Sequence, residues 1–353
     1  MSKALAFPCK NAGRKIGASL FALGPRRPTL SGTLNGVTHG SSSIMPDNDR
    51  LITRRSMLAK SAITLAALSR PGWLRGEEKA KARRIAVTID DGPATGTGRD
   101  LAAFLRIANA LRETFVAENV PAIMFVNERQ LHIDGQRDER VDTLHRWLDA
   151  GLDVGNHTYS HPNLNDVTLA RYLDDIIKGE VISRSLLETR NRTLVWFRYP
   201  FLASGSEETA TAVEEFLAVR GYRIAPVSVD YADYRFAGFH SQHLRAGDQQ
   251  KADQQFATML ETLDVSFARA ETRSVEVLGY ELPQTLLIHC NELNALTLKT
   301  TIQRIRDRGY TFVSLDEAMK DPAYNVTGMR PGGMGGGGFF SSLVAAKTEV
   351  GKR

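Results

Sequence analysis

The sequence of 353 residues contains only two cysteines, Cys9 and Cys290. Cys9 falls in an N-terminal region that we interpret as a leader, so we expect the folded part to hold one thiol and no internal disulfide. A zinc site built from cysteine thiolates is therefore excluded.

A strong charge of either sign and a long hydrophobic run are also missing. The formal net charge is only +5, with both signs interleaved along the chain. This distribution predicts a solvated surface and no nucleic-acid partner. Beyond an export signal we expect no stable membrane span, because the apolar run at 61–68 is too short to cross a bilayer with ease. Apolar residues make up 42% of the chain, which is enough for a sizeable core.

Residues 1–82 are interpreted as a leader that is disordered or removed. Arg54 and Arg55 precede the apolar run, which is typical of a twin-arginine export signal over about 45–70. The alternative is a basic, disordered N-terminus with a chance pair of arginines. Met45 is an alternative start to Met1, and no clean cleavage site follows, so the segment is either removed or kept as an anchor. The signal predicts export to the periplasm or the cell envelope.

Residues 83–322 are predicted to form a single catalytic domain in which short apolar strands alternate with amphipathic helices. Such alternation predicts a parallel α/β fold, open or closed into a barrel. The predicted strands are 85–90, 122–126, 152–155, 194–199, 222–230, 285–289 and 310–313. The predicted helices are 101–115, 141–150, one starting at 165 or 166, 207–220, 249–269 and 296–308. Residues 323–353 are Gly-rich and are predicted to be a flexible tail, in which Phe339 and Phe340 could dock.

Titratable side chains follow strand after strand, at the point where each strand ends. Asp90 and Asp91 follow the first strand, and Gly92 and Pro93 end it. Neighbouring residues of a strand point in different directions, so the two aspartates should have different roles. Because the carboxyl ends of parallel strands meet at one edge, we expect an active site there. Asp-Asp-Gly-Pro taken alone would be read as a simple turn.

His157 and His161 are four residues apart and follow the third predicted strand. Both imidazoles could reach one metal ion, and with a carboxylate they would make a two-histidine, one-carboxylate set. The alternative is a pair of ordinary histidines, one of which caps the helix after Pro162.

Five motifs in this order resemble those of the polysaccharide deacetylases of carbohydrate esterase family 4. That family deacetylates chitin, chitooligosaccharides, peptidoglycan N-acetylglucosamine and acetylxylan. The resemblance covers about 84–318 and implies a distorted (β/α)7 barrel. The motifs are Thr88-Ile-Asp-Asp-Gly-Pro93, His157-x-x-x-His161, Arg198-x-Pro200-Phe201, Asp230-x-x-Asp233-Tyr234 and Leu287-x-His289.

The resemblance implies a divalent metal, usually Zn²⁺ with Co²⁺ or another ion as substitutes, held by Asp91, His157 and His161. It implies that Asp90 is the general base that deprotonates the attacking water. Arg198 would pair with Asp90 and keep it ionised.

The resemblance further implies that His289 is the general acid, oriented and charged by Asp233. The backbone N–H of Phe201 would help to stabilise the oxyanion. The residues expected to contact the glycan substrate are Tyr199, Pro200 and Tyr234.

Three positions depart from the family pattern and leave the substrate open. Tyr234 stands where tryptophan is usual, Cys290 where aspartate is common, and Tyr199 where proline is frequent. The leading hypothesis is a metal-dependent deacetylase acting on an N- or O-acetylated glycan of the cell envelope. The alternatives are a C–N hydrolase acting on a small amide or imide, and a carbohydrate-binding protein with a relic site.

Overall fold

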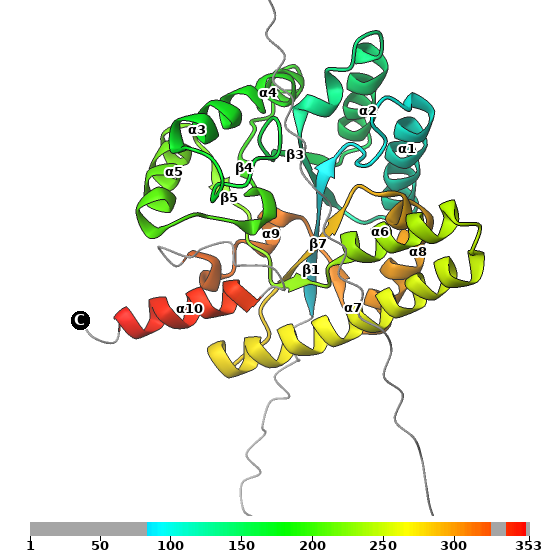
Figure 1. Cartoon of the computed structure of the whole chain (residues 1–353). Helices are drawn as coiled ribbons and strands as arrows, with labels where there is room; N and C mark the ends of the chain where they lie inside the picture. Colours follow the sequence, from blue (N-terminus) through cyan, green and yellow to red (C-terminus); the bar gives the residue numbers. More distant parts are fainter. Residues whose placement is uncertain (1–82, 326–336, 351–353) are drawn as a thin grey trace, which may run out of the picture. The chain divides into compact units, whose positions relative to one another are not determined.

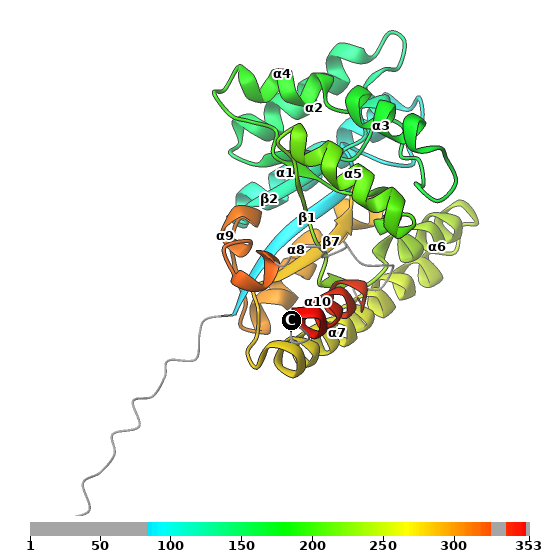
Figure 2. The ribbon, with the colours of Figure 1, turned by 90° about the vertical axis from the view of Figure 1, so that its left-hand side faces the viewer.

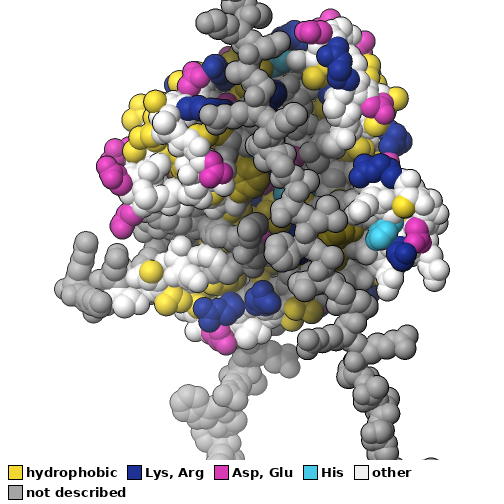
Figure 3. Space-filling model, viewed as in Figure 1, with side chains coloured by type: hydrophobic (Ala, Val, Ile, Leu, Met, Phe, Trp, Pro, Cys, Tyr) yellow, Lys and Arg dark blue, Asp and Glu magenta, His cyan; other side chains and the backbone are white. Residues whose placement is uncertain are grey.

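The computed structural model describes residues 83–325 and 337–350 (Figure 1). The predicted leader, with Arg54 and Arg55, lies outside the described residues. Within the described ranges, no helix combines the length and the apolar run needed to cross a bilayer. Positive and negative side chains are interspersed over the face shown in Figure 3.

A parallel sheet forms the centre of the fold, and its helices lie around it (Figures 1 and 2). Its main path runs β5-β4-β3-β2-β1-β7-β6, and β8 pairs with β1. The longest strand, β1, is buried along most of its length because its residues are apolar and β-branched. The strands are β1 (Arg84–Gly92), β2 (Ala122–Val126), β3 (Asp153–Asn156), β4 (Trp196–Phe197), β5 (Arg223–Ile224), β6 (Val229–Asp230), β7 (Gln284–His289) and β8 (Thr311–Phe312).

The segment 223–230 connects the two ends of this sheet. The sequence predicted a single strand over 222–230. In the structure this stretch divides into β5, which pairs with β4, and β6, which pairs with β7. Between them, the Ala225 N–H donates to Phe197 O and the Ser228 N–H donates to Thr285 O. This broken strand therefore pairs with both edges of the sheet. The sheet thereby takes the form of the predicted distorted (β/α)7 barrel.

Helices follow most strands, and polar side chains cap many of their N-termini. The structure corrects the predicted bounds in several places: α3 starts at Leu169 after the cap Thr168, α7 continues to Leu278, and α8 starts at Glu292. Helix α6 was not predicted. The helices are α1 (Leu101–Ala117), α2 (Arg137–Asp149), α3 (Leu169–Lys178), α4 (Val181–Glu188), α5 (Glu207–Val219), α6 (Asp233–Arg245), α7 (Gln249–Leu278), α8 (Glu292–Asp307), α9 (Leu315–Ala318) and α10 (Gly337–Val350), with short 3₁₀ turns at η1 (Glu128–Leu131), η2 (Pro200–Leu202) and η3 (Pro322–Asn325).

The prediction of a flexible tail over 323–353 is wrong for its described parts. Residues 322–325 form η3, and α10 lies against α7 (Figures 1 and 2). Phe339, Phe340 and Leu343 are buried, and the Phe339 ring packs on Tyr324 at 5.2 Å between centroids. Burial of these apolar side chains outweighs the low helix propensity of the glycines that open α10.

Candidate active site

Two adjacent carboxylates leave the end of β1 in different directions, as the sequence predicted. Asp90 is paired in register with His289 of β7, and its side chain is only 4% exposed. Asp91 has a positive φ of 62° and a side chain that is 22% exposed. The backbone turn at Asp91 thus leaves the Asp90 carboxylate almost fully buried and the Asp91 carboxylate partly exposed.

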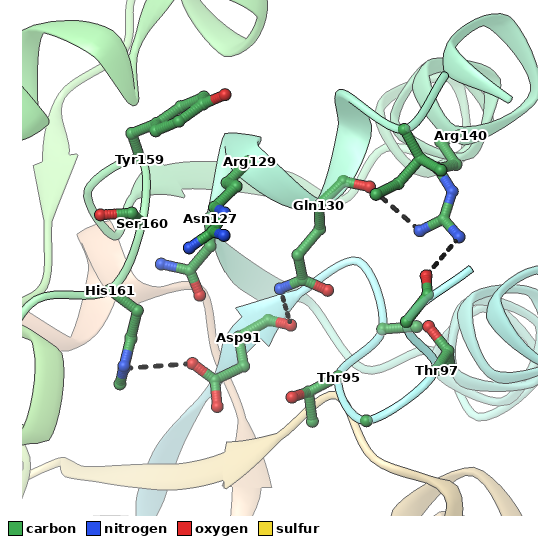
Figure 4. Close-up of a pocket in the computed structure, with 14 residues that line it drawn as sticks. Asp91, Thr95, Thr97, Asn127, Arg129, Gln130, Arg140, Tyr159, Ser160 and His161 are labelled. Atoms are coloured by element: carbon green, nitrogen blue, oxygen red, sulfur yellow. Dashed lines mark hydrogen bonds and ion pairs between the residues drawn. The ribbon is translucent and has the colours of Figure 1, made fainter. Parts of the chain in front are cut away.

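Asp91, His157 and His161 form a candidate metal-binding cluster, because one ligand atom from each lies within 4.8 Å of the others. His161 Nε2 is 3.2 Å from Asp91 Oδ1, an approach drawn in Figure 4, and His157 Nε2 is 3.7 Å from the same oxygen. The His157 Nδ1–H donates to the Arg198 carbonyl at 2.8 Å, which leaves Nε2 free to bind a metal. Burial lowers the pKa of both imidazoles and so favours the neutral form that binds metals. This donor set fits a divalent ion.

The cluster is held by backbone in an uncommon conformation. Asp91, Thr158 and His161 all have φ near +60° although none is glycine. Such conformations persist only where the surroundings enforce them, and they gather at functional sites. Here Asn127 Nδ2 donates to His157 O at 2.6 Å and holds the loop after β3 in place.

Asp90 forms a buried ion pair with Arg198 at the centre of the sheet. Arg198 Nη1 lies 3.3 Å from Asp90 Oδ2, and the guanidinium also donates to Thr88 Oγ1 and Ala225 O, each at 3.0 Å. Burial raises the pKa of Asp90, the charge of Arg198 opposes this, and the net pKa is about 6. A carboxylate with this pKa is ionised at neutral pH yet basic enough to accept a proton.

Asp233 supports His289 from behind. Its Oδ1 accepts a hydrogen bond from His289 Nδ1 at 2.7 Å, and its Oδ2 accepts one from the His289 N–H at 2.9 Å. Burial works against protonation of His289, but the charge of Asp233 outweighs it and raises the pKa to about 10. Asp233 itself has a lowered pKa because its hydrogen bonds and the His289 charge overcome its burial. His289 is therefore protonated at neutral pH.

Sequence reasoning missed two asparagines that complete this arrangement. Asn291 Nδ2 and Asn294 Nδ2 donate to Asp233 Oδ2 at 3.1 and 2.5 Å, and Asn294 also donates to His289 O. Asn291 is the N-cap of α8, so its position directly after the strand and before a helix was the available signal. Cys290, between them and His289, is fully buried.

The metal-binding cluster, Asp90 and His289 face one cavity of about 360 Å³. Phe201 and Tyr234 stand exposed at its rim, where their rings pack on His161 at 4.5 Å and on His289 at 5.4 Å. Leu202 and Leu287 give it an apolar lining. The full lining is Asp90, Asp91, His157, His161, Phe201, Leu202, Asp230, Tyr234, Leu287 and His289.

The prediction that Tyr199 and Pro200 contact the substrate does not fit this geometry. Both are buried, and neither lines the cavity. The Tyr199 ring instead packs on Tyr172 and Phe197 in the core. The chain turns at Phe201, where φ is 58°, so the aromatic group that reaches the cavity is Phe201.

Comparison with known proteins finds similarity between part of this chain and a known family. A family model described as polysaccharide deacetylase matches residues 77–220 of the chain. The chain is 24% identical over 242 residues to the peptidoglycan-N-acetylglucosamine deacetylase PgdA of Listeria monocytogenes. The aligned region covers 68% of this chain but only 40% of that protein. It is 25% identical over 241 residues to the chitin deacetylase of Colletotrichum lindemuthianum, covering 68% of this chain and 81% of that one.

A solved structure, the peptidoglycan deacetylase PdaC of Bacillus subtilis, is also similar. It is 21% identical with a TM-score of 0.45, over 69% of this chain and 95% of that chain. The chain thus spans less than half the length of its Listeria relative and most of the fungal one.

Proposed function

We propose that this protein is a metal-dependent hydrolase that removes acetyl groups from an N-acetylated or O-acetylated glycan of the cell envelope. The observation that carries the proposal is the register Asp90–His289, which sets a carboxylate of pKa about 6 beside an imidazolium of pKa about 10. Amide hydrolysis needs such a base and acid on either side of the carbonyl. The names of the two curated relatives support an acetylated glycan as the substrate.

In this proposal Asp91, His157 and His161 hold the metal, with Zn²⁺ as the expected ion and Co²⁺ as a substitute. When bound, a divalent ion supplies Lewis acidity and brings the pKa of a water near 7. Nitrogen and oxygen ligands in this number suit zinc and leave room for substrate.

The remaining residues move protons and position the substrate. Asp90 takes a proton from the attacking water, while Arg198 holds its carboxylate in place. His289 gives a proton to the departing amine or alcohol, and Asp233 keeps it charged and oriented. The Phe201 N–H donates to the oxyanion. The exposed Phe201 and Tyr234 rings offer apolar faces to a sugar.

The match to the family model and the paired arginines of the sequence support export to the periplasm or envelope, through a twin-arginine signal. The decisive test of function is acetate release from peptidoglycan, chitooligosaccharides and acetylxylan after chelation and after addition of zinc or cobalt. We expect release that depends on added metal. Glycan binding without release would favour a relic site, and turnover of small amides or imides alone would favour a different C–N hydrolase.

A further inference from the structure

A second cavity, of about 310 Å³, adjoins the metal-binding cluster and shares Asp91 and His161 with it. Its walls come from the loop after β1, from η1 and from the loop after β3 (Figure 4). Thr95 and Thr97 place hydroxyl groups along one side, and Tyr159 and Ser160 lie on the other. A group bound here would lie directly next to the reacting acetamide.

Positive charge in this cavity is unbalanced. Arg129 is exposed, and its guanidinium makes no ion pair or hydrogen bond to any side chain or carbonyl within 83–325 and 337–350. Arg140 is 1% exposed, and its hydrogen-bond acceptors among the described residues are all uncharged. Those acceptors are Gln130 O, Gly98 O and Gln136 Oε1. Asp91, a proposed metal ligand, is the only carboxylate that lines the cavity among the described residues.

The buried Arg140 also fixes the shape of this wall. Its bonds to Gln130 O and Gly98 O tie η1 to the loop after β1 at 3.0 and 2.8 Å. Gln130 Nε2 in turn donates to the Asp91 carbonyl at 3.0 Å (Figure 4). Burial, and then the nearby charge of Arg99, lower the pKa of Arg140. The wall is thus rigid and positive.

The opposite side of the site differs. A cavity of about 590 Å³ there shares Asp91, Thr95 and Thr97 but contains carboxylates as well as arginines. Arg106 is paired with Glu292 at 2.5 Å, so its charge is balanced, while Arg245 forms no ion pair with any residue that the structure describes. The excess of positive charge therefore lies in the cavity lined by Arg129, and it would orient a substrate that carries a negative charge.

Given the proposed deacetylase function, on which this inference rests, we propose that the cavity binds a carboxylate on the sugar next to the N-acetylated one. The substrate is then an acidic glycan, and Arg129 is its specificity-determining contact. Arg129 donates to the carboxylate, and Arg140 adds a fixed positive charge in a partly desolvated wall. A neutral, chitin-like chain offers no anion to pair with either arginine.

The test compares the metal-loaded wild type with Arg129→Gln and with Arg245→Gln, a matched control from the other cavity. The probes are an oligosaccharide of alternating N-acetylglucosamine and N-acetylmuramic acid, the same molecule with its lactyl carboxylates amidated, and a chitooligosaccharide of equal length. Acetate release gives kcat and KM, and calorimetry gives the affinity for each probe.

We expect Arg129→Gln to raise KM and the dissociation constant for the acidic probe about fivefold. This is the change in affinity expected from the loss of a partly exposed ion pair. The amidated and neutral probes should be unaffected, and the wild-type preference for the acidic probe should fall with added salt. Arg245→Gln should keep that preference. Equal effects of Arg129→Gln on charged and amidated probes, or none, overturn the inference. Charge-selective binding without acetate release would refute the deacetylase proposal and leave the carboxylate site standing.

Discussion

Replacing Asp90 by asparagine separates proton transfer from metal binding. The amide has nearly the shape of the carboxylate, but it cannot take a proton from water. Loss of a general base costs about 10²–10⁴-fold in turnover. We expect a fall of that size at every metal concentration, because the cluster of Asp91, His157 and His161 is left intact.

The substitution also has a structural cost, set by Arg198, which is fully buried. Deleting one partner of a buried ion pair costs about 3–5 kcal/mol. Asparagine still offers an oxygen to Arg198 Nη1, and the bonds to Thr88 Oγ1 and Ala225 O remain. We therefore expect a loss of about 1–3 kcal/mol in the free energy of unfolding, and a larger loss for Asp90→Ala.

Asp91→Asn should weaken metal binding and leave the proposed general base in place. It exchanges an anionic ligand for a neutral one and leaves two imidazoles as the main protein ligands. Metal affinity should fall, and part of the activity should return with excess zinc or cobalt because Asp90 and His289 are still present.

Metal content by mass spectrometry after gel filtration, together with acetate release against added metal, distinguishes the two variants. Thermal unfolding of each checks that the protein is folded. The reasoning is falsified if Asp90→Asn loses its metal while Asp91→Asn retains it, which would exchange the two roles.

Four further outcomes are expected. His289→Ala should keep its metal and lose about 10²–10⁴-fold in turnover; loss of zinc would place His289 among the ligands. Asp233→Asn should lower the raised pKa of His289, so the loss of activity at high pH should begin at lower pH; an unchanged pH profile would contradict this role. Phe339→Ala should lower the free energy of unfolding by about 3 kcal/mol in denaturant titration, since the ring is fully buried, and an unchanged midpoint would show that α10 adds no stability. Replacing Arg54 and Arg55 by lysine should block export, and unchanged delivery in cell fractions would refute the twin-arginine interpretation.

Much of the site was predictable because charged side chains at successive strand ends must converge in a parallel sheet. This reasoning placed Asp90, Asp91, His157 and His161 at one edge of the sheet, where the structure has them. The choice of Asp91 as a metal ligand and the pairing of Asp90 with Arg198 came from the resemblance to the deacetylase motifs. Their roles remain predictions.

The elements that sequence reasoning missed lacked a local signal. Helix α6 begins after Ala232, whose φ is 54°, and alanine at that position does not indicate a helix start. Asn291 carried only a helix-capping signal and Asn294 carried none, so neither was marked as a partner of Asp233. Helix α10 opens with glycines and is stabilised by packing, which only the folded chain shows.

The broken strand 223–230 helps to position the buried ion pair of Arg198 and Asp90. Arg198 donates to Ala225 O and, more weakly, to Pro226 O, and both carbonyls belong to the segment that joins the two edges of the sheet. Until that segment docks, the guanidinium lacks two of its acceptors, and Asp90 lacks a fixed counter-charge. The closure of the sheet and the position of the guanidinium beside Asp90 are thus coupled through this segment.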